Sequence, residues 1–312
     1  MRALPFLCTL LRPCALVRPS AALLRSTVLE LAILTAHVLM YPTGMTQERR
    51  PPPPPLPPAP TEARDTRERE TREAREVLEG REGQEGPDAA GADDTPGAGH
   101  VTHLPVLLLH GFIDNRSVFL LLRRSLLRNG WRHVWSLNYS PLTCDLRTAA
   151  TLLARHVEEV CAATGHERVD MVGHSLGGLV ARYYIQRLGG DARVRTLVTL
   201  GTPHGGTRVA PLMSAHPLVR QMRPDSDVIA ELAEPAPHCA TQFIGFWSDL
   251  DQIMVPVETA RIDHPDLMAR NVRVSGVGHL ALPVHGAVAA GIRQALTTEE
   301  AMAGARGAAS VA

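Results

Sequence analysis

The sequence contains no lysine, so all 32 of its basic residues are arginine. We attribute this bias to a GC-rich genome rather than to function. An excess of charge of one sign is also lacking, because 32 acidic residues balance the arginines. A neutral chain gives no reason to expect nucleic acid as a partner.

Motifs for metals, disulfides and nucleotides are lacking as well. The five cysteines show no Cys-x-x-Cys spacing, which argues against a zinc site and a disulfide framework. The sequence has neither metal-ligand spacing nor a phosphate-binding glycine loop, so we expect no metal and no cofactor. The remaining composition, 45% hydrophobic and 21% charged, is ordinary for a soluble globular protein of one or two domains.

The first 100 residues lack the apolar pattern of a folded domain. Residues 1–45 are apolar, and 21–41 has about the ~20 residues that a membrane-spanning helix needs. Glu30 and His37 are seven residues apart and share one helix face, which is typical of an interfacial or a paired membrane helix. We interpret 1–45 as a membrane anchor or targeting segment, with a misplaced start codon as an alternative. The Pro-rich and charged residues 46–100 predict a disordered linker.

Strand and helix patterns alternate through residues 101–297. Apolar runs predict strands at 104–111, 132–139, 168–174, 194–203, 241–248 and 269–279, and helical spacing predicts helices at 117–130, 145–165 and 175–190. This alternation predicts an α/β fold with a doubly wound, mostly parallel sheet and helices on both faces. Ligands of such sheets bind at the carboxyl ends of the strands. The Ala- and Gly-rich residues 298–312 predict a frayed tail.

The stretch Gly-His-Ser-Leu-Gly lies where a predicted strand meets a predicted helix. Ser175 stands there between Gly173 and Gly177, which allow a turn too tight for side chains on both flanks. A serine in such a turn projects its hydroxyl from the end of the strand, and the free N–H groups of the helix point to the same place. The pattern is typical of a nucleophile elbow, and the alternative is an ordinary glycine-rich turn.

A serine nucleophile needs a base, and the base needs a group that orients it. In this type of fold the order along the chain is serine, acid, histidine. His279 follows the last predicted strand and is the candidate base. Asp249 and Asp251 follow the preceding strand. Apolar residues and a proline come directly after Asp251 and return the chain to the protein, so we favour Asp251 and expect Asp249 to cap the turn or face water.

The tetrahedral oxyanion of acyl transfer needs hydrogen-bond donors. We expect one donor to be the backbone N–H of Leu176, the residue after the nucleophile. The second is expected from the loop after the first strand of the domain, which reads His110-Gly111-Phe112. Gly111 allows the chain to turn there, so that the N–H of Phe112 faces the pocket.

These elements, in this order, resemble the α/β-hydrolase superfamily and in particular bacterial lipases and esterases. The resemblance lies in LLLHGF (107–112), VDMVGHSLGGLVARYY (169–184), TLVTLGTPHGG (196–206), SDLDQIMVP (248–256) and GVGHLALP (276–283). It covers most of the domain and does not extend to the first 100 residues. The resemblance implies an α/β-hydrolase fold and the hydrolysis of carboxylic esters, lipid acyl esters among them, through an acyl-enzyme on Ser175.

Three other histidines and one long connection have alternative readings. We expect His174 to be structural, because its side chain points away from the serine hydroxyl. His110 is expected to stabilise the oxyanion loop, and both His110 and His204 are candidates for the pocket rim, with a turn cap as the alternative for His204. Residues 205–240 are too long for a simple connector, and form either a lid over the acyl site or plain packing helices.

The hypothesis from sequence is therefore a serine lipase or esterase that acts on acyl esters or lipids and associates with a membrane through its N-terminal segment. That implies a membrane-associated or extracytoplasmic location in a bacterial cell envelope, with the cytoplasmic side as the alternative. An acyltransferase or thioesterase would use the same three residues. A non-catalytic α/β-hydrolase scaffold is the remaining alternative, although none of the three residues is missing.

Overall fold

The computed structural model describes residues 21–44, 103–112, 114–139, 145–208 and 216–309. The linker predicted at 46–100 lies outside these residues, as does the part of the N-terminal segment before residue 21.

The described residues form one parallel sheet of six strands in the order β2-β1-β3-β4-β5-β6. The strands are β1 Val106–Leu109, β2 Val134–Leu137, β3 Val169–His174, β4 Val194–Leu200, β5 Gln242–Ser248 and β6 Met268–Val274. Each coincides with a predicted strand. The strands β1, β3 and β4 are buried at every residue, as expected for strands covered on both faces. The order reverses between β1 and β3, and that reversal places the loops after these two strands side by side.

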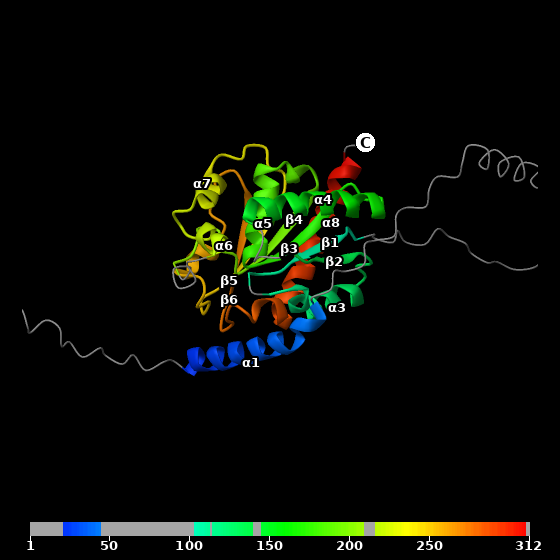
Figure 1. Ribbon diagram of the computed structural model, residues 1–312. Helices are drawn as coiled ribbons and strands as arrows, with labels where there is room; N and C mark the ends of the chain where they lie inside the picture. Colours follow the sequence, from blue (N-terminus) through cyan, green and yellow to red (C-terminus); the bar gives the residue numbers. More distant parts are fainter. Residues whose placement is uncertain (1–20, 45–102, 113, 140–144, 209–215, 310–312) are drawn as a thin grey trace, which may run out of the picture.

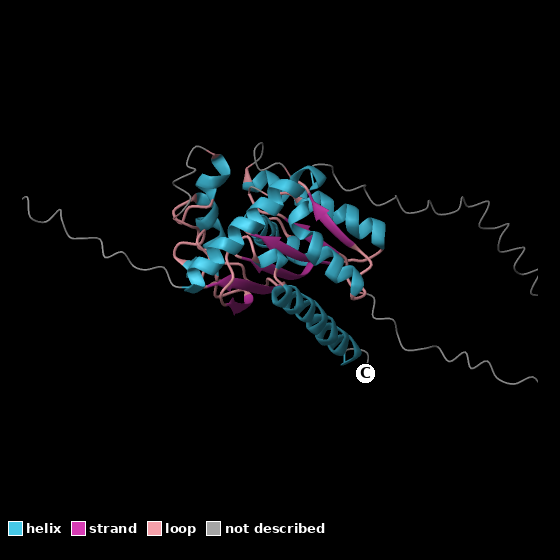
Figure 2. Cartoon of the chain, turned by 90° about the horizontal axis from the view of Figure 1, so that it is seen from below, coloured by secondary structure: helices cyan, strands magenta, loops and turns pink. Residues whose placement is uncertain are grey.

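Helices cover both faces of the sheet (Figures 1 and 2), which confirms the predicted fold class. One layer holds α4 Leu146–Thr164 and α5 Leu176–Arg187, and the other holds η1 Arg116–Phe119, α3 Leu120–Arg128 and α8 Gly286–Ala309. Short 3-10 turns are η2 Gly190–Ala192, η4 Val257–Ala260 and η5 Leu282–Val284. Both ends of α4 are capped: Asp145 accepts from the N–H of Thr148 at 2.7 Å, and Gly165 is left-handed.

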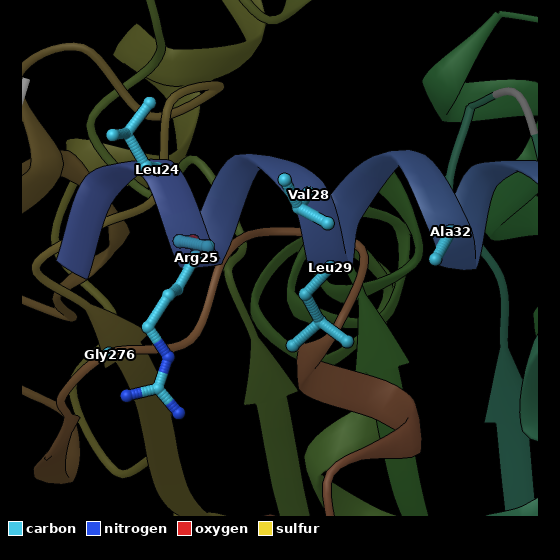
Figure 3. A pocket seen from close by; sticks show the side chains of 7 residues that line it. Leu24, Arg25, Val28, Leu29, Ala32 and Gly276 are labelled. Carbon is cyan, nitrogen blue, oxygen red and sulfur yellow. The ribbon is translucent and has the colours of Figure 1, made fainter. Parts of the chain in front are cut away.

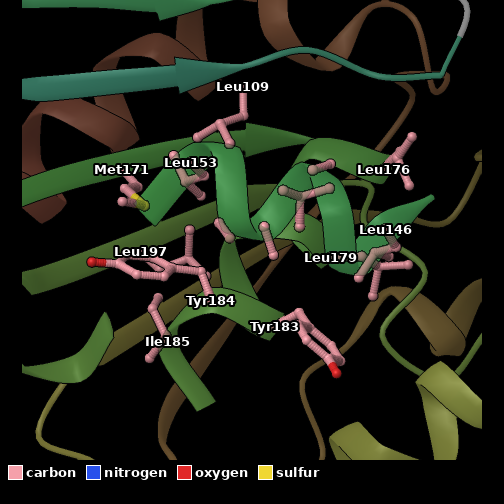
Figure 4. Close-up of a cluster of buried hydrophobic side chains, with 14 of the residues drawn as sticks. Leu109, Leu146, Leu153, Met171, Leu176, Leu179, Tyr183, Tyr184, Ile185 and Leu197 are labelled. Carbon is pink, nitrogen blue, oxygen red and sulfur yellow. The ribbon is translucent and has the colours of Figure 1, made fainter. Parts of the chain in front are cut away.

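Two apolar clusters fill the spaces between the sheet and its helices. The cluster beneath α4 and α5 (Figure 4) contains Leu153, Met171 and Leu179, all of them fully buried. The cluster on the opposite face joins α3 and α8 to the sheet through Leu122 and Ile292. Burial of each such side chain stabilises the fold by about 1.5–3 kcal/mol. These two layers hold the strands whose ends carry the predicted site.

The segment 205–240 contains two short helices, α6 Pro217–Gln221 and α7 Asp227–Ala233. They bury Leu218, Val228 and Leu232 in the cluster beneath α5, and whether the segment also acts as a lid stays a prediction. The helix α8 continues to Ala309, where the sequence predicted fraying from residue 298. Alanine has the highest helix propensity of any residue, and this accounts for the difference.

The apolar N-terminal segment forms α1, Ala21–Gly44, which lies along the domain (Figure 1). Residues Leu24–Pro42 are long and apolar enough to cross a membrane. The helix nevertheless makes hydrogen bonds to the loops that follow β1, β2, β5 and β6. The composition of this segment predicts a part separate from the domain, whereas the structure places it across the carboxyl edge of the sheet.

Adjacent leucines on α4 offer a matched test of this packing. Leu153 is fully buried, whereas Leu152 is 37% exposed. We expect Leu153→Ala to lower the free energy of unfolding by about 2–5 kcal/mol, because it leaves a cavity in the core. The change Leu152→Ala removes the same atoms from the surface and should alter stability by no more than about 0.5 kcal/mol. Urea unfolding of both variants measures the difference, and equal losses would contradict the assigned helix face.

Candidate active site

Ser175 occupies the turn between β3 and α5. Its backbone has φ 53° and ψ −121°, a conformation that non-glycine residues rarely adopt. Its N–H donates to the carbonyl oxygen of Leu200 at 2.9 Å, which holds the strained turn against β4. A Cβ on Gly173 would lie 2.6 Å from the Cα of Gly178, and one on Gly177 would overlap the carbonyl of Leu109. Both glycines are therefore required by close backbone approach, as the elbow pattern predicts.

His279 and Asp251 form a buried pair beside this turn. The Nδ1 atom of His279 lies 2.7 Å from Oδ2 of Asp251, and the two residues are 4% and 2% exposed. The other carboxylate oxygen of Asp251 accepts from the N–H groups of Ile253 at 2.9 Å and Met254 at 3.1 Å. These contacts fix the carboxylate in a short turn after β5. With Nδ1 committed to Asp251, Nε2 is the ring nitrogen left to face a substrate or the serine.

The electrostatics of this pair follow from burial and mutual contact. Burial lowers the pKa of His279, but the charge and hydrogen bond of Asp251 outweigh it, so the pKa is raised from its usual 6.5. Burial raises the pKa of Asp251, but the charge and hydrogen bond of His279 and the hydrogen bonds of two backbone N–H groups outweigh this effect. The pKa of Asp251 is therefore lowered overall. The arrangement therefore stabilises the charged forms of both residues.

Asp249 lies outside the pair. Its carboxylate bonds to the guanidinium of Arg273 at 2.7 Å and to the N–H of Gly276 at 3.4 Å. Burial raises the pKa of Asp249, but the hydrogen bonds from Arg273 and Gly276 lower it overall. Of the two acids that the sequence offered, the structure brings Asp251 to His279 and leaves Asp249 at a turn near the surface.

A second buried pair, His174 and Asp114, lies against His279. The sequence did not predict this pair. The ring of His174 lies 4.8 Å from the ring of His279, with Nε2 3.2 Å from the carbonyl oxygen of His279 and Nδ1 3.2 Å from Oδ2 of Asp114. Burial raises the pKa of Asp114, but the hydrogen bond and charge of His174 lower it overall. The expectation that His174 is structural agrees with these contacts, and Asp114 gave no sequence signal beyond following the first strand.

Gly201, at the end of β4, is a further residue that the sequence analysis did not single out. Its φ is +53°, and a Cβ there would lie 2.9 Å from Oδ2 of Asp251 and 3.0 Å from Nδ1 of His279. A side chain would therefore intrude on the hydrogen bond between these two residues. The sequence signal for Gly201 is the stretch Leu-Gly-Thr-Pro, in which a glycine directly follows a buried strand.

The loop after β1 lies against the serine. A Cβ on Gly111 would lie 2.9 Å from Oδ2 of Asp114 and 3.3 Å from the Cβ of Ser175, so a side chain there would crowd this part of the site. His110 braces the loop: its Nδ1 lies 2.8 Å from the carbonyl oxygen of Gly111, and its ring stacks on Tyr139 with centroids 4.4 Å apart. The hydroxyl of Tyr139 donates to the carbonyl oxygen of His110. These contacts are the stabilising ones expected of His110.

A mostly apolar cavity of about 290 Å³ joins these parts. Ser175, His279, His174, Asp114, Gly111 and Phe112 lie in its wall, and the apolar lining comes from Leu34, Val219, Met222, Ile253, Met254 and Leu280. Val219 and Met222 belong to the 205–240 segment, which therefore contributes to the cavity as well as to the core. Glu30 and Leu34 come from α1, and nothing in the sequence predicted that the N-terminal helix would reach the site.

His204 and His110 are not among the residues that line this cavity, and their place at its rim stays a prediction. His204 is buried beneath the loop after β4, and burial lowers its pKa well below the usual value. Its Nδ1 lies 3.3 Å from a guanidinium nitrogen of Arg182, which is a donor only, so Nε2 donates to the hydroxyl of Thr199 at 3.0 Å. A metal was not expected, and the described residues contain no cluster of three His, Cys, Asp or Glu side chains that would hold one.

Comparison with known proteins places this geometry in a family. The family model described as palmitoyl protein thioesterase matches residues 105–260, half of the chain. Triacylglycerol lipases of Burkholderia plantarii and Vibrio cholerae are 33% identical over 130 residues and 31% identical over 137 residues. These matches cover 39% and 42% of this chain, and the chain spans only 35% and 41% of the two lipases.

Solved structures support the same fold. The mature form of a Bacillus licheniformis lipase superposes with a TM-score of 0.51 at 14% identity, over 62% of this chain and 92% of that one. A likeness at this identity bears on the fold alone, which is the α/β-hydrolase fold predicted from the sequence. From the extent of the matching family model, together with this fold, the chain belongs to the palmitoyl protein thioesterase family of α/β-hydrolases.

Proposed function

We propose that the chain is a serine hydrolase that cleaves carboxylic esters, with lipid acyl esters as the substrate class. The observation that carries the proposal is the buried contact of 2.7 Å between His279 and Asp251, because His279 lines the same cavity as the strained Ser175. A serine, a histidine and an acid in this arrangement are the parts that nucleophilic acyl transfer needs. The triacylglycerol lipases that share sequence with the chain support the same reaction class.

The proposed reaction gives each of these groups one role. The hydroxyl oxygen of Ser175 attacks the acyl carbon while Nε2 of His279 takes its proton, and Asp251 stabilises the imidazolium that forms. The backbone N–H groups of Phe112 and Leu176 donate to the oxyanion. Collapse of the tetrahedral intermediate breaks the bond to the alcohol, which leaves with the proton from His279. Water then attacks the acyl-enzyme with His279 again as the base, and the carboxylic acid is released.

The lining of the cavity supports an apolar acyl group as the part of the substrate that is bound. Phe112, Val219, Met222 and Met254 present hydrocarbon or thioether surface, and methionine side chains adapt readily to different shapes. A location at a membrane remains a prediction, to which the length and apolar character of α1 contribute.

A thioesterase is the second candidate, and the family model that matches residues 105–260 favours it. The same three residues would attack a thioester, and a thiolate is an easier leaving group than an alkoxide. The two candidates are separated by kcat/KM for an oxygen ester and a thioester with the same acyl chain. A large preference for the thioester supports the second candidate, and comparable values support the first.

Loss of the nucleophile or the base tests the proposal directly. Ser175→Ala and His279→Ala should each lower kcat on a short chromogenic ester by about 10³–10⁶, because the three residues act as a unit. Circular dichroism and thermal unfolding provide the control that both variants are folded. Wild-type turnover in folded Ser175→Ala would rule out the acyl-enzyme mechanism.

The two aspartates provide a matched pair of variants. Asp251→Asn should lower kcat by about 10²–10⁴, because the amide no longer stabilises the imidazolium of His279. Asp249→Asn should cost no more than about tenfold, since its carboxylate contacts Arg273 and Gly276 rather than the histidine. Steady-state kinetics on both variants decide the assignment. A severe loss in Asp249→Asn beside a mild loss in Asp251→Asn would reverse it.

The raised pKa of His279 predicts a pH dependence. The base must be neutral to accept the serine proton, so kcat/KM should rise with pH through an ionisation above 6.5 and be lost as the pH falls below it. In Asp251→Asn the charge that raises this pKa is absent while burial remains, so the acidic limb should move to lower pH. The measurement is the pH profile of kcat/KM for both proteins, and an unmoved limb would show that Asp251 does not set the pKa.

A further inference from the structure

The two faces of α1 are reversed relative to an ordinary surface helix. The residues that turn toward the domain include Ser26, Glu30 and His37, and Ser26 is only 2% exposed. The opposite face is apolar and open to solvent, with Val28 at 67%, Leu31 at 59%, Val38 at 65% and Leu39 at 74% exposure. A surface helix of a soluble protein normally buries its apolar side and exposes its polar side. The outward face of α1, defined here as Leu24, Val28, Leu31, Val38 and Leu39, therefore lacks a partner within the described residues.

Specific polar contacts hold the inward face on the domain. Both carboxylate oxygens of Glu30 accept backbone hydrogen bonds, from Leu280 at 2.9 Å and from Ala281 at 3.0 Å. These two residues follow His279 directly and lead into η5, so Glu30 satisfies donors that the turn itself leaves free. His37 lies with Nδ1 3.6 Å from Oδ1 of Asp114. The polar stripe that the sequence shows on α1 is thus a docking stripe against the catalytic loops.

Hydrogen bonds also attach the two ends of α1 to the domain. Near its start, the side-chain amide of Gln252 donates to the hydroxyl of Thr27 at 3.3 Å. Near its end, the side-chain amides of Asn115 and Asn138 donate to the carbonyl oxygens of Tyr41 at 2.8 Å and Gly44 at 2.7 Å. The helix is therefore held along its length, parallel to the carboxyl edge of the sheet.

The helix α1 also takes part in the cavity that holds Ser175. Glu30 and Leu34, on the inward side of the helix, form part of the cavity wall. A second hollow of about 760 Å³ runs along the helix and is lined mainly by apolar side chains, Leu24, Val28, Leu29 and Ala32 among them. Figure 3 shows Arg25 reaching from α1 toward the loop that holds Gly276, while Leu24 extends from the other side of the helix.

The charge of the chain around α1 favours an anionic partner. Residues 1–29 contain Arg2, Arg12, Arg18 and Arg25 and no aspartate or glutamate. The first acidic residue is Glu30, whose charge is already engaged by two backbone N–H groups. An apolar helix face flanked by arginine is the combination that binds the surface of a membrane with anionic headgroups.

We propose that the outward face of α1 contacts an anionic lipid bilayer, with the helix lying in the plane of the membrane surface and still docked on the domain. In this arrangement the cavity with Ser175 opens at the lipid surface. The proposal deepens the proposed function, and rests on it for the substrate that enters there. A spanning α1 would instead have to break the hydrogen bonds of Glu30 and carry this carboxylate and the His37 ring into hydrocarbon.

Binding of the full-length chain to vesicles tests the proposal. Flotation with vesicles of phosphatidylcholine and phosphatidylglycerol should recover the wild type, and should recover the double variant Leu31→Glu/Val38→Glu about tenfold less. Leu152→Glu/Leu188→Glu places the same charges on exposed leucines of α4 and the end of α5, and should bind as wild type. Both variants should keep wild-type hydrolysis of a soluble short-chain ester without vesicles, which shows that they are folded.

Further outcomes decide against the other arrangements of α1. An in-plane helix should be released from the vesicles by alkaline carbonate, and resistance to this wash would overturn the proposal in favour of a spanning helix. Equal vesicle binding by wild type and Leu31→Glu/Val38→Glu would also overturn it. So would a wild-type dimer that does not bind vesicles and that these two substitutions disperse. Ser175→Ala should still bind vesicles, so a failure of the proposed catalysis and a failure of the membrane surface are told apart.

Discussion

The hydrogen bond between Asp251 and His279 is the contact on which the rest of the site depends. It joins the loop after β5 to the loop after β6, and its buried charges favour one another while burial disfavours each alone. Two neighbouring residues leave this contact undisturbed. Gly201 lacks the side chain that would reach it, and His174 holds the carbonyl of His279 from behind.

The parallel sheet explains why residues so distant in sequence meet. The strands all point the same way, and the order reverses between β1 and β3, so the loops after β1, β3, β5 and β6 converge at one edge. The helix α1 crosses that same edge and adds Glu30 to it. The loops at this edge therefore contact the core on one side and α1 on the other. The inverted polarity of α1 follows from this position, because the backbone N–H groups beneath it need an acceptor.

Histidines at this edge differ in role because their surroundings differ. The charge and hydrogen bond of Asp251 raise the pKa of His279 against the effect of burial, whereas burial, with a smaller contribution from the charge of Arg182, lowers the pKa of His204. His110 stacks on Tyr139 and bonds its own loop. All three follow strands in glycine-containing stretches, and only the contacts formed on folding distinguish the candidate base His279 from the other two.

Sequence alone predicted the strands, the helices that cover them, the tight turn at Ser175 and the candidates His279 and Asp251. Local patterns specify these features: continuous apolar runs, and glycines at a tight turn. The roles of Asp114 and Gly201 were decided only by tertiary structure, since each acts through residues far away in the chain. The same holds for α1. Its composition predicts a helix suited to lipid, but whether Glu30 and His37 face a bilayer, another helix or the domain depends on which unpaired donors and charges lie nearby after folding. Those donors, at Leu280 and Ala281, are some 250 residues further along the chain.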